Sequence, residues 1–97
     1  MKTKIKYGIV GSGLMGCEHI SNINLIDSAE VVAISDSNEN SINKAKNLIS
    51  NDIKIYSNNT EIFNNNEVDA FIISTPNFTH HDIIKEALKT KKHLLIE

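Results

Sequence analysis

The chain has 97 residues, enough for one domain but too few for a two-domain enzyme. Ten Lys and twelve acidic residues give a net charge of −2, so nothing indicates a nucleic-acid partner, and no apolar run approaches the ~20 residues that cross a bilayer. A single Cys, and a basic N-terminus followed by glycines instead of a secretory apolar core, predict a cytoplasmic protein.

The first half of the chain predicts two strand–helix units. Residues 4–10 are rich in Ile, Val and Tyr and run into glycines, as a strand entering a tight turn does. From residue 14 to about 26 apolar residues recur at helical spacing, and a second strand follows at 31–35. Asn38 can cap the second helix. The expected buried helix positions are Cys17, Ile20, Ile23, Ile26, Ile42, Ala45, Leu48 and Ile49.

The second half repeats the alternation of strands and helices. Residues 54–56 form a weak strand and 60–65 a short helix, and the strongly apolar run at 68–74 is a strand. A helix capped by Thr79 is expected to reach about residue 90, and residues 93–96 form the last strand. Its expected buried positions are Ile83, Ile84, Ala87 and Leu88.

Strands separated by helices imply right-handed crossovers and a parallel sheet covered on both faces. The sequence therefore predicts an α/β fold, a Rossmann-like doubly wound parallel sheet of about five strands, over residues 1–97.

The strongest chemical signal is the segment Gly-Ser-Gly-Leu-Met-Gly at residues 11–16, placed where the first strand meets the first helix. Gly11 permits the tight turn, Gly13 lets the backbone approach a pyrophosphate, and Gly16 lets the helix pack closely on the strand. Free N–H groups at the helix start attract the anion. Three glycines near a turn can also serve only to ease a crossover.

Asp36 favours the dinucleotide interpretation. It follows Gly16 by twenty residues, at the end of the second predicted strand, where a carboxylate accepts hydrogen bonds from a ribose diol. The same carboxylate repels a phosphate on the ribose 2′ position, and the chain has no Arg, so NAD is expected in preference to NADP.

A second candidate segment, residues 74–80, ends the fourth strand. Ligands of open parallel sheets bind at such strand ends, and Asn77 and His80 offer polar groups to a cofactor or substrate. The segment is equally well interpreted as a loop in which Thr79 caps a helix and His80 is an ordinary first-turn residue. No metal site is expected, because adjacent His and Asp residues on a helix point in different directions. Cys17 is expected to be a core residue.

Together these features resemble the N-terminal part of the Gfo/Idh/MocA oxidoreductases. The resemblance covers essentially the whole chain and rests on residues 7–16, on Asp36, on the run from Val68 to His80, and on residues 92–97. In that family a Rossmann domain binds NAD or NADP, and a separate C-terminal domain forms most of the substrate site and the oligomer contact. The resemblance therefore implies a homo-oligomeric full-length protein.

The resemblance implies pyrophosphate contacts in the glycine motif, a ribose contact at Asp36, and nicotinamide-side contacts after the fourth strand. The expected cofactor-binding residues are Gly11, Gly13, Leu14, Met15, Gly16, Asp36, Ser74, Thr75, Pro76, Asn77, His80 and Glu97. No residue is assigned as catalytic with certainty, although His80 and Glu97 fall near the expected site.

Two departures from the family pattern stand out. The family's Glu-Lys-Pro motif stops at Glu97, so the lysine usually assigned to proton transfer is missing, and with it the substrate domain. Lys91 replaces a glycine at a helix end, where a left-handed non-glycine residue costs roughly 1 kcal/mol.

The function expected is an NAD(P)-dependent oxidoreductase whose parent enzyme transfers hydride between nicotinamide and a hydroxyl-bearing carbon of a sugar or polyol. The 97-residue chain is expected to be a fragment without turnover of its own. The alternative is a non-catalytic dinucleotide-binding module or a truncated pseudoenzyme.

Overall fold

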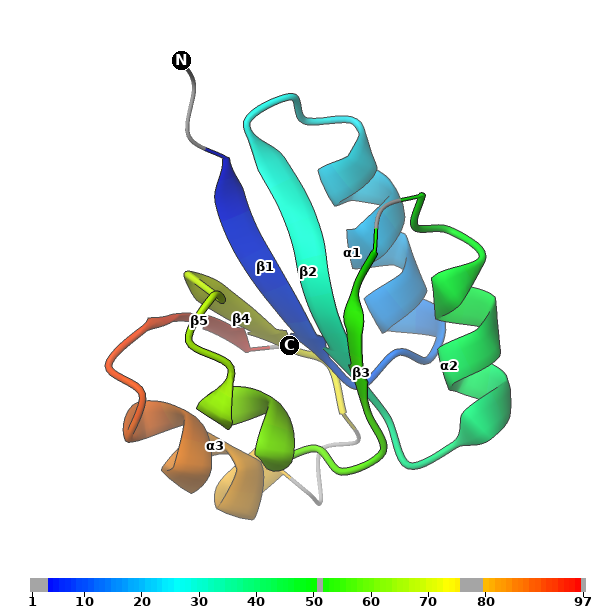
Figure 1. Cartoon of the computed structure of the whole chain (residues 1–97). Helices are drawn as coiled ribbons and strands as arrows, with labels where there is room; N and C mark the ends of the chain where they lie inside the picture. The colour runs from blue at the N-terminus through cyan, green and yellow to red at the C-terminus, as the bar shows by residue number, and fades with distance from the viewer. Residues whose placement is uncertain (1–3, 51, 76–79, 97) are drawn as a thin grey trace.

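The computed structural model describes residues 4–50, 52–75 and 80–96, apart from the side chains of Leu14 and His80. Strands and helices alternate along the chain, as predicted (Figure 1). The elements are β1 (Ile5–Val10), α1 (Leu14–Asn24), β2 (Ala29–Ser35), α2 (Glu39–Lys46), β3 (Lys54–Tyr56), the 3-10 helix η1 (Glu61–Asn64), β4 (Ala70–Ile73), α3 (His80–Leu88) and β5 (His93–Ile96).

The five strands form one parallel sheet in the order β3-β2-β1-β4-β5. The chain leaves β1 toward one edge of the sheet, and after β3 it returns to β4 on the other side of β1. The order therefore switches direction between β1 and β4, where parallel sheets bind ligands at the carboxyl ends of the strands. The predicted doubly wound Rossmann-like fold is confirmed.

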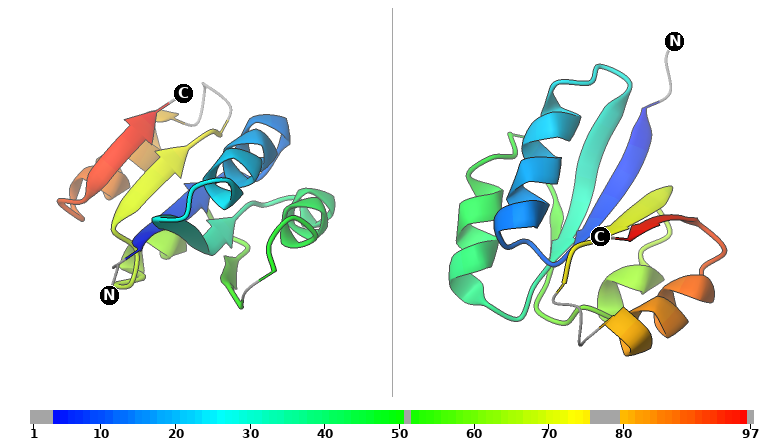
Figure 2. Two further views of the ribbon diagram at one scale, coloured as in Figure 1. Left: turned by 90° about the horizontal axis from the view of Figure 1, so that it is seen from above. Right: turned by 180° about the vertical axis from the view of Figure 1, so that it is seen from behind.

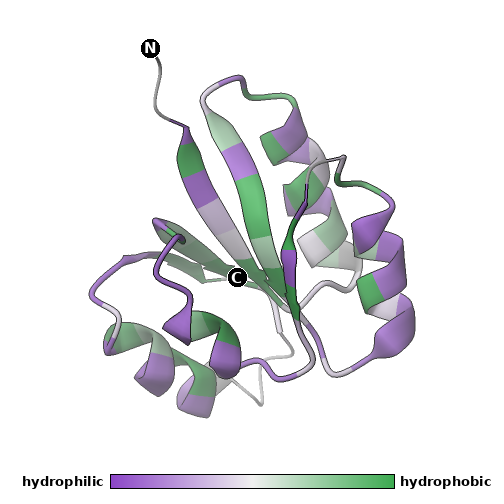
Figure 3. Cartoon of the chain, in the orientation of Figure 1, coloured by the Kyte–Doolittle hydropathy of each residue, from purple (hydrophilic) through white to green (hydrophobic). Residues whose placement is uncertain are grey.

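Helices cover both faces of the sheet, with α1 and α2 on one face and η1 and α3 on the other (Figure 2). Figure 3 shows the apolar stretches along the central strands and the polar outer sides of α2 and α3. One core cluster joins Ile20 and Ile23 of α1 to the sheet, and the other packs Phe63 of η1 against Phe71 of β4. The two phenyl rings meet edge to face, with centroids 4.8 Å apart.

Three expected core positions are exposed instead. Helix α1 ends at Asn24 and α2 at Lys46, so Ile26 and Leu48 lie beyond the helices and are 50% and 39% exposed. The last turn of α1 tightens, because the backbone N–H of Ile26 bonds Ile23 at i−3 spacing (N···O 2.9 Å) and turns the chain toward β2. Leu88, the last residue of α3, is 63% exposed.

The helix end after α3 takes the predicted left-handed form. Lys91 has φ 59° and is the one non-glycine residue with positive φ among those that the structure describes. Lys92 follows it and turns its ammonium group back toward the loop before β4, where it donates hydrogen bonds to the carbonyl oxygens of Asn66 and Val68. No helix in the described part of the chain is long and apolar enough to cross a membrane.

Candidate functional site

The glycine motif follows β1 at the carboxyl edge of the sheet, as predicted. Gly11 has φ +89°, a conformation that side chains rarely adopt. A Cβ at this position would lie 2.9 Å from Cγ2 of Thr75 and 3.0 Å from its backbone nitrogen. Both conformation and space therefore require glycine here, where the chain passes beside the end of β4.

Gly16 and Gly13 play opposite parts in the motif. A Cβ on Gly16 would lie 2.2 Å from the carbonyl oxygen of Gly11, so only glycine lets α1 pack against the turn. Around the Cβ position of Gly13 no described atom lies within 4 Å. Gly13 is also the N-cap of α1 and provides no side-chain cap for the first N–H groups. Open space in front of uncapped N–H groups fits a phosphate.

Asp36 lies directly after β2 and faces the glycine motif. Its carboxylate accepts the backbone N–H of Ser12 through Oδ2 and that of Asn38 through Oδ1, each at 2.8 Å. Asn38 in turn caps α2 by accepting the N–H of Ser41 (3.1 Å). The carboxylate thus lies between the motif and the start of α2, and each of its oxygens keeps a lone pair for a ribose hydroxyl.

Ser74 reaches the motif from the other side, at the end of β4. Its hydroxyl donates to the carbonyl oxygen of Gly11 at 2.7 Å, and its backbone N–H donates to Val10 at 2.9 Å. The hydroxyl therefore points at the glycine turn, whereas sequence reasoning placed Ser74 only among the expected cofactor contacts.

A pocket of about 330 Å³ opens between α1 and α2 beside the motif; Gly13, Cys17 and Lys44 are among the residues that line it. The hydroxyl of Ser12, also on this pocket, is buried and has no hydrogen-bond partner among the described residues. Buried polar groups usually have one. Cys17 packs against the core but is only partly buried. Burial raises the pKa of its thiol, the nearby Lys44 lowers it, and Asp36 raises it.

Several predicted site residues lie outside what the structure describes. Pro76, Asn77 and Glu97 belong to this group, and the side chains of Leu14 and His80 are not described either. His80 is the first residue of α3, Met15 is 43% exposed in the first turn of α1, and Thr75 is buried next to Gly11. The cofactor roles of all the candidate residues stay predictions.

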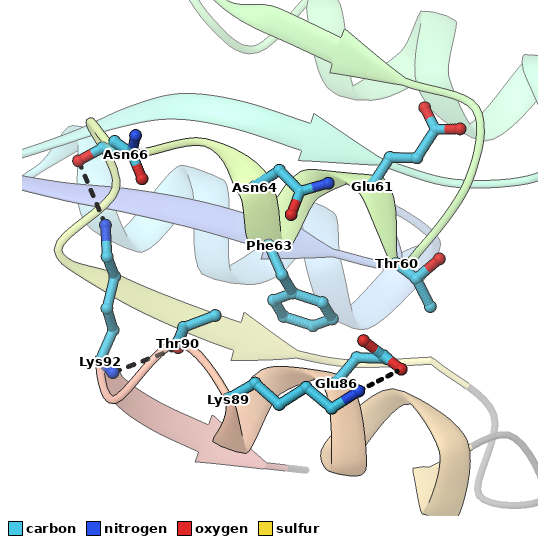
Figure 4. A pocket seen from close by; sticks show the side chains of 9 residues that line it. All are labelled: Thr60, Glu61, Phe63, Asn64, Asn66, Glu86, Lys89, Thr90 and Lys92. Atoms are coloured by element: carbon cyan, nitrogen blue, oxygen red, sulfur yellow. Dashed lines mark hydrogen bonds and ion pairs between the residues drawn. The ribbon is translucent and has the colours of Figure 1, made fainter.

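A second pocket, of about 470 Å³, lies between η1 and α3, away from the glycine motif (Figure 4). Both of its lysines already have partners, because Lys89 pairs with Glu86 at 3.2 Å and Lys92 donates to backbone carbonyls. Within the described residues no three His, Cys, Asp or Glu side chains gather where a metal ion could bind. The glycine motif and its two side-chain partners therefore form the candidate site.

Sequence reasoning missed the hydrogen bonds that join the parts of this site. Ser74 and Gly11 are 63 residues apart, and Asp36 and Ser12 are 24 apart. The spacing of residues along the sequence does not predict pairs that are so far apart. The signal that could have found them is the predicted strand order, which places the ends of β2 and β4 on either side of β1.

Fold and glycine motif together define an NAD-binding Rossmann domain. The chain belongs to the Gfo/Idh/MocA family, because residues 5–97 match the family described as "Oxidoreductase family, NAD-binding Rossmann fold".

The relatives share this N-terminal part. The myo-inositol 2-dehydrogenase of Thermotoga maritima is 30% identical over 93 residues, which cover 96% of this chain and 28% of that protein. The 2,7-anhydro-N-acetylneuraminate hydratase of Escherichia coli is 33% identical over 93 residues, covering 96% of this chain and 24% of that protein.

Solved structures agree in fold. Myo-inositol dehydrogenase from Lactobacillus casei, in complex with NAD(H) and myo-inositol, superposes with a TM-score of 0.88 at 27% identity, over 97% of this chain and 28% of that one. The chain thus spans less than a third of the length of each of these three relatives.

Proposed function

We propose that this chain is the cofactor-binding part of an NAD-dependent dehydrogenase that acts on a hydroxyl-bearing carbon of a polyol or sugar. One observation carries the proposal: the open, uncapped start of α1 at Gly13 lies beside the carboxylate of Asp36, so a phosphate site and a ribose site adjoin. The adenosine diphosphate half of NAD has both a pyrophosphate and a ribose, linked directly to each other.

The chain's own groups would divide the work of binding. The N–H groups at the start of α1 would bind the pyrophosphate, and Asp36 would accept the ribose hydroxyls. The segment from Thr75 to His80 would border the nicotinamide. Bound nicotinamide supplies hydride transfer. The names and bound ligands of the inositol dehydrogenases support a polyol as the substrate class, and the hydratase among the relatives makes a direct test necessary.

Calorimetric titration tests the binding part. NAD and ADP-ribose should both bind the 97-residue chain, whereas nicotinamide mononucleotide should bind much more weakly, because Asp36 and the glycine motif face the adenosine side of the cofactor. Absence of heat with both NAD and ADP-ribose would overturn the proposal. Equal affinity for nicotinamide mononucleotide would also overturn it, because that ligand lacks the adenosine half.

The catalytic part is tested by turnover. With NAD and myo-inositol, the 97-residue chain should form no reduced nicotinamide, because it covers only 28% of the length of the dehydrogenases to which it is similar. Measurable reduction would show that this part alone carries the catalytic groups and would contradict its assignment as the cofactor-binding part. A cytoplasmic location and a homo-oligomeric longer protein, both expected from the sequence, remain proposals.

A further inference from the structure

One peptide group in the glycine motif is held at both ends by side chains from two different strands. The carbonyl of Gly11 accepts the hydroxyl of Ser74 at 2.7 Å, and the N–H of Ser12 donates to Asp36 at 2.8 Å. These two groups belong to the same peptide unit, which is planar, so they move together. The peptide unit is thus fixed from β4 on one side and from β2 on the other.

This peptide lies where backbone freedom is greatest. Gly11 has φ +89°, and glycine populates many other conformations at little cost, so its own residue type does not hold the turn in this form. Packing adds to the restraint: a Cβ on Gly16 would approach the Gly11 oxygen to 2.2 Å and the Ser74 hydroxyl to 3.2 Å. The Gly11 carbonyl therefore lies close to helix α1 at Gly16 as well as to the hydroxyl of Ser74.

We infer that Ser74 is a positioning residue for the cofactor: together with Asp36 it fixes the Gly11–Ser12 peptide, and through it the N–H groups that would receive the pyrophosphate. The inference rests on the proposed function for the identity of the ligand. It adds a role that the expected cofactor contacts do not include, because Ser74 acts through the backbone of the motif.

The same geometry predicts coupling between the ribose and pyrophosphate parts of the site. Asp36 holds one end of the peptide and is also the expected ribose acceptor. Removing either of these two hydrogen bonds leaves the peptide unit free to rotate about the bond that remains. The loss caused by the second removal should therefore be smaller than the loss caused by the first.

The test compares Ser74→Ala with Ser35→Ala in the 97-residue chain. Ser35 is a matched control, because its hydroxyl also makes one hydrogen bond at the end of a strand, to Asn59 at 2.8 Å, without contacting the Gly11–Ser12 peptide through its side chain. By calorimetry, Ser74→Ala should bind NAD about three- to tenfold more weakly than wild type, and Ser35→Ala should bind within about twofold of wild type.

Amide exchange followed by NMR gives a measurement without cofactor. The Ser12 amide should exchange about three- to tenfold faster in Ser74→Ala, whereas the amide of Ile20 in the core of α1 should keep its rate. In an Asp36→Asn background, Ser74→Ala should cost less NAD affinity than it does alone. A Ser12 amide that is unaffected, an unchanged NAD affinity, or strictly additive losses would each overturn the inference.

Failure of the proposed function gives a different result. In that case wild type itself would bind neither NAD nor ADP-ribose, while the exchange of the Ser12 amide would still report whether Ser74 holds the peptide.

Discussion

The glycine motif follows the central strand β1, whereas β5 is an edge strand of the same sheet, and the two regions differ in how completely they are packed. At the motif, Gly11, Ser12 and Gly16 are buried, and side chains from β2 and β4 bond its backbone. At β5, Leu95 is 52% exposed and Ile96 43% exposed. The backbone of the motif is held by side-chain hydrogen bonds from two strands, whereas apolar side chains of β5 are exposed.

Strand register explains the exposure of Leu95. Leu95 pairs with Ile72 of β4, which faces the α1 side of the sheet, whereas Leu94 pairs with Phe71 and packs under α3. Helix α1 covers the centre of the sheet, and within the described residues no element covers its face above β5. The exposure of Leu95 therefore follows from where the helices lie.

The largest expected effect comes from adding one methyl group at Gly16. In Gly16→Ala the new Cβ would be forced to 2.2 Å from the Gly11 oxygen, and the helix would have to move away from the turn. We expect a loss of about 3 kcal/mol in the free energy of unfolding, measured by urea denaturation, together with loss of NAD binding.

Gly13→Ala is the matched control, because nothing described lies within 4 Å of its Cβ position. Its unfolding free energy should fall by about 1 kcal/mol or less, the cost of alanine at an N-cap, while NAD binding weakens because the methyl group occupies the phosphate space. Equal destabilisation by the two variants would show that the motif is not packed as described.

Asp36→Ala should have the next largest effect. Hydrogen bonds to a charged group contribute about 1.5–3 kcal/mol, so NAD affinity should fall roughly ten- to a hundredfold in calorimetry. NADP affinity should fall less or rise, because the carboxylate repels a 2′ phosphate. Lys46 and Glu39 line a pocket with Asp36, so the nearby side chains add one charge of each sign. Tighter binding of NADP than of NAD by wild type would contradict the assignment of Asp36.

Local patterns in the sequence were sufficient for most of this architecture. Apolar periodicity and the glycines give the alternation of strands and helices, and the handedness of crossovers gives a parallel sheet. Periodicity failed at Leu48 and Leu88, which continue the apolar pattern of their helices yet are 39% and 63% exposed. Where a helix ends depends on how the chain turns into the next strand, which the pattern does not contain.

Some parts of the candidate site could also be predicted from the sequence, and others could not. Gly11, Gly16 and Asp36 could be selected from spacing alone, since the turn requires the glycines and the strand end places the carboxylate. The contact between Ser74 and Gly11 could not, because it joins residues 63 apart through one hydroxyl. Lys92 is similar: its ammonium group bonds the carbonyls of Asn66 and Val68, a contact between a helix end and a distant loop.

A charged residue on β5 tests whether the exposed apolar side chains of this strand cause self-association. The exposed apolar edge predicts self-association of the 97-residue chain, and Leu95→Lys should weaken it about tenfold, because lysine on an edge strand disfavours further strand pairing. Ile26→Lys is the control, since Ile26 is 50% exposed but lies in the loop before β2. Light scattering at increasing concentration measures the effect, and a stable wild-type monomer would contradict it.

The smallest effect is expected at Cys17. The alkylation rate of its thiol reports on the charges near the glycine motif. Burial raises the pKa of its thiol, and only the thiolate reacts with iodoacetamide, so alkylation near neutral pH should be slower than in the unfolded chain and should rise only at higher pH. Lys44→Ala removes the charge that lowers this pKa and should slow the reaction further, whereas Asp36→Asn removes a charge that raises it and should speed the reaction.

Saturating NAD should slow alkylation, because Cys17 and Gly13 line the same pocket. Mass spectrometry of the time course measures all five rates. An alkylation rate that changes in neither Lys44→Ala nor Asp36→Asn would contradict the electrostatic influence of these two side chains on the thiol.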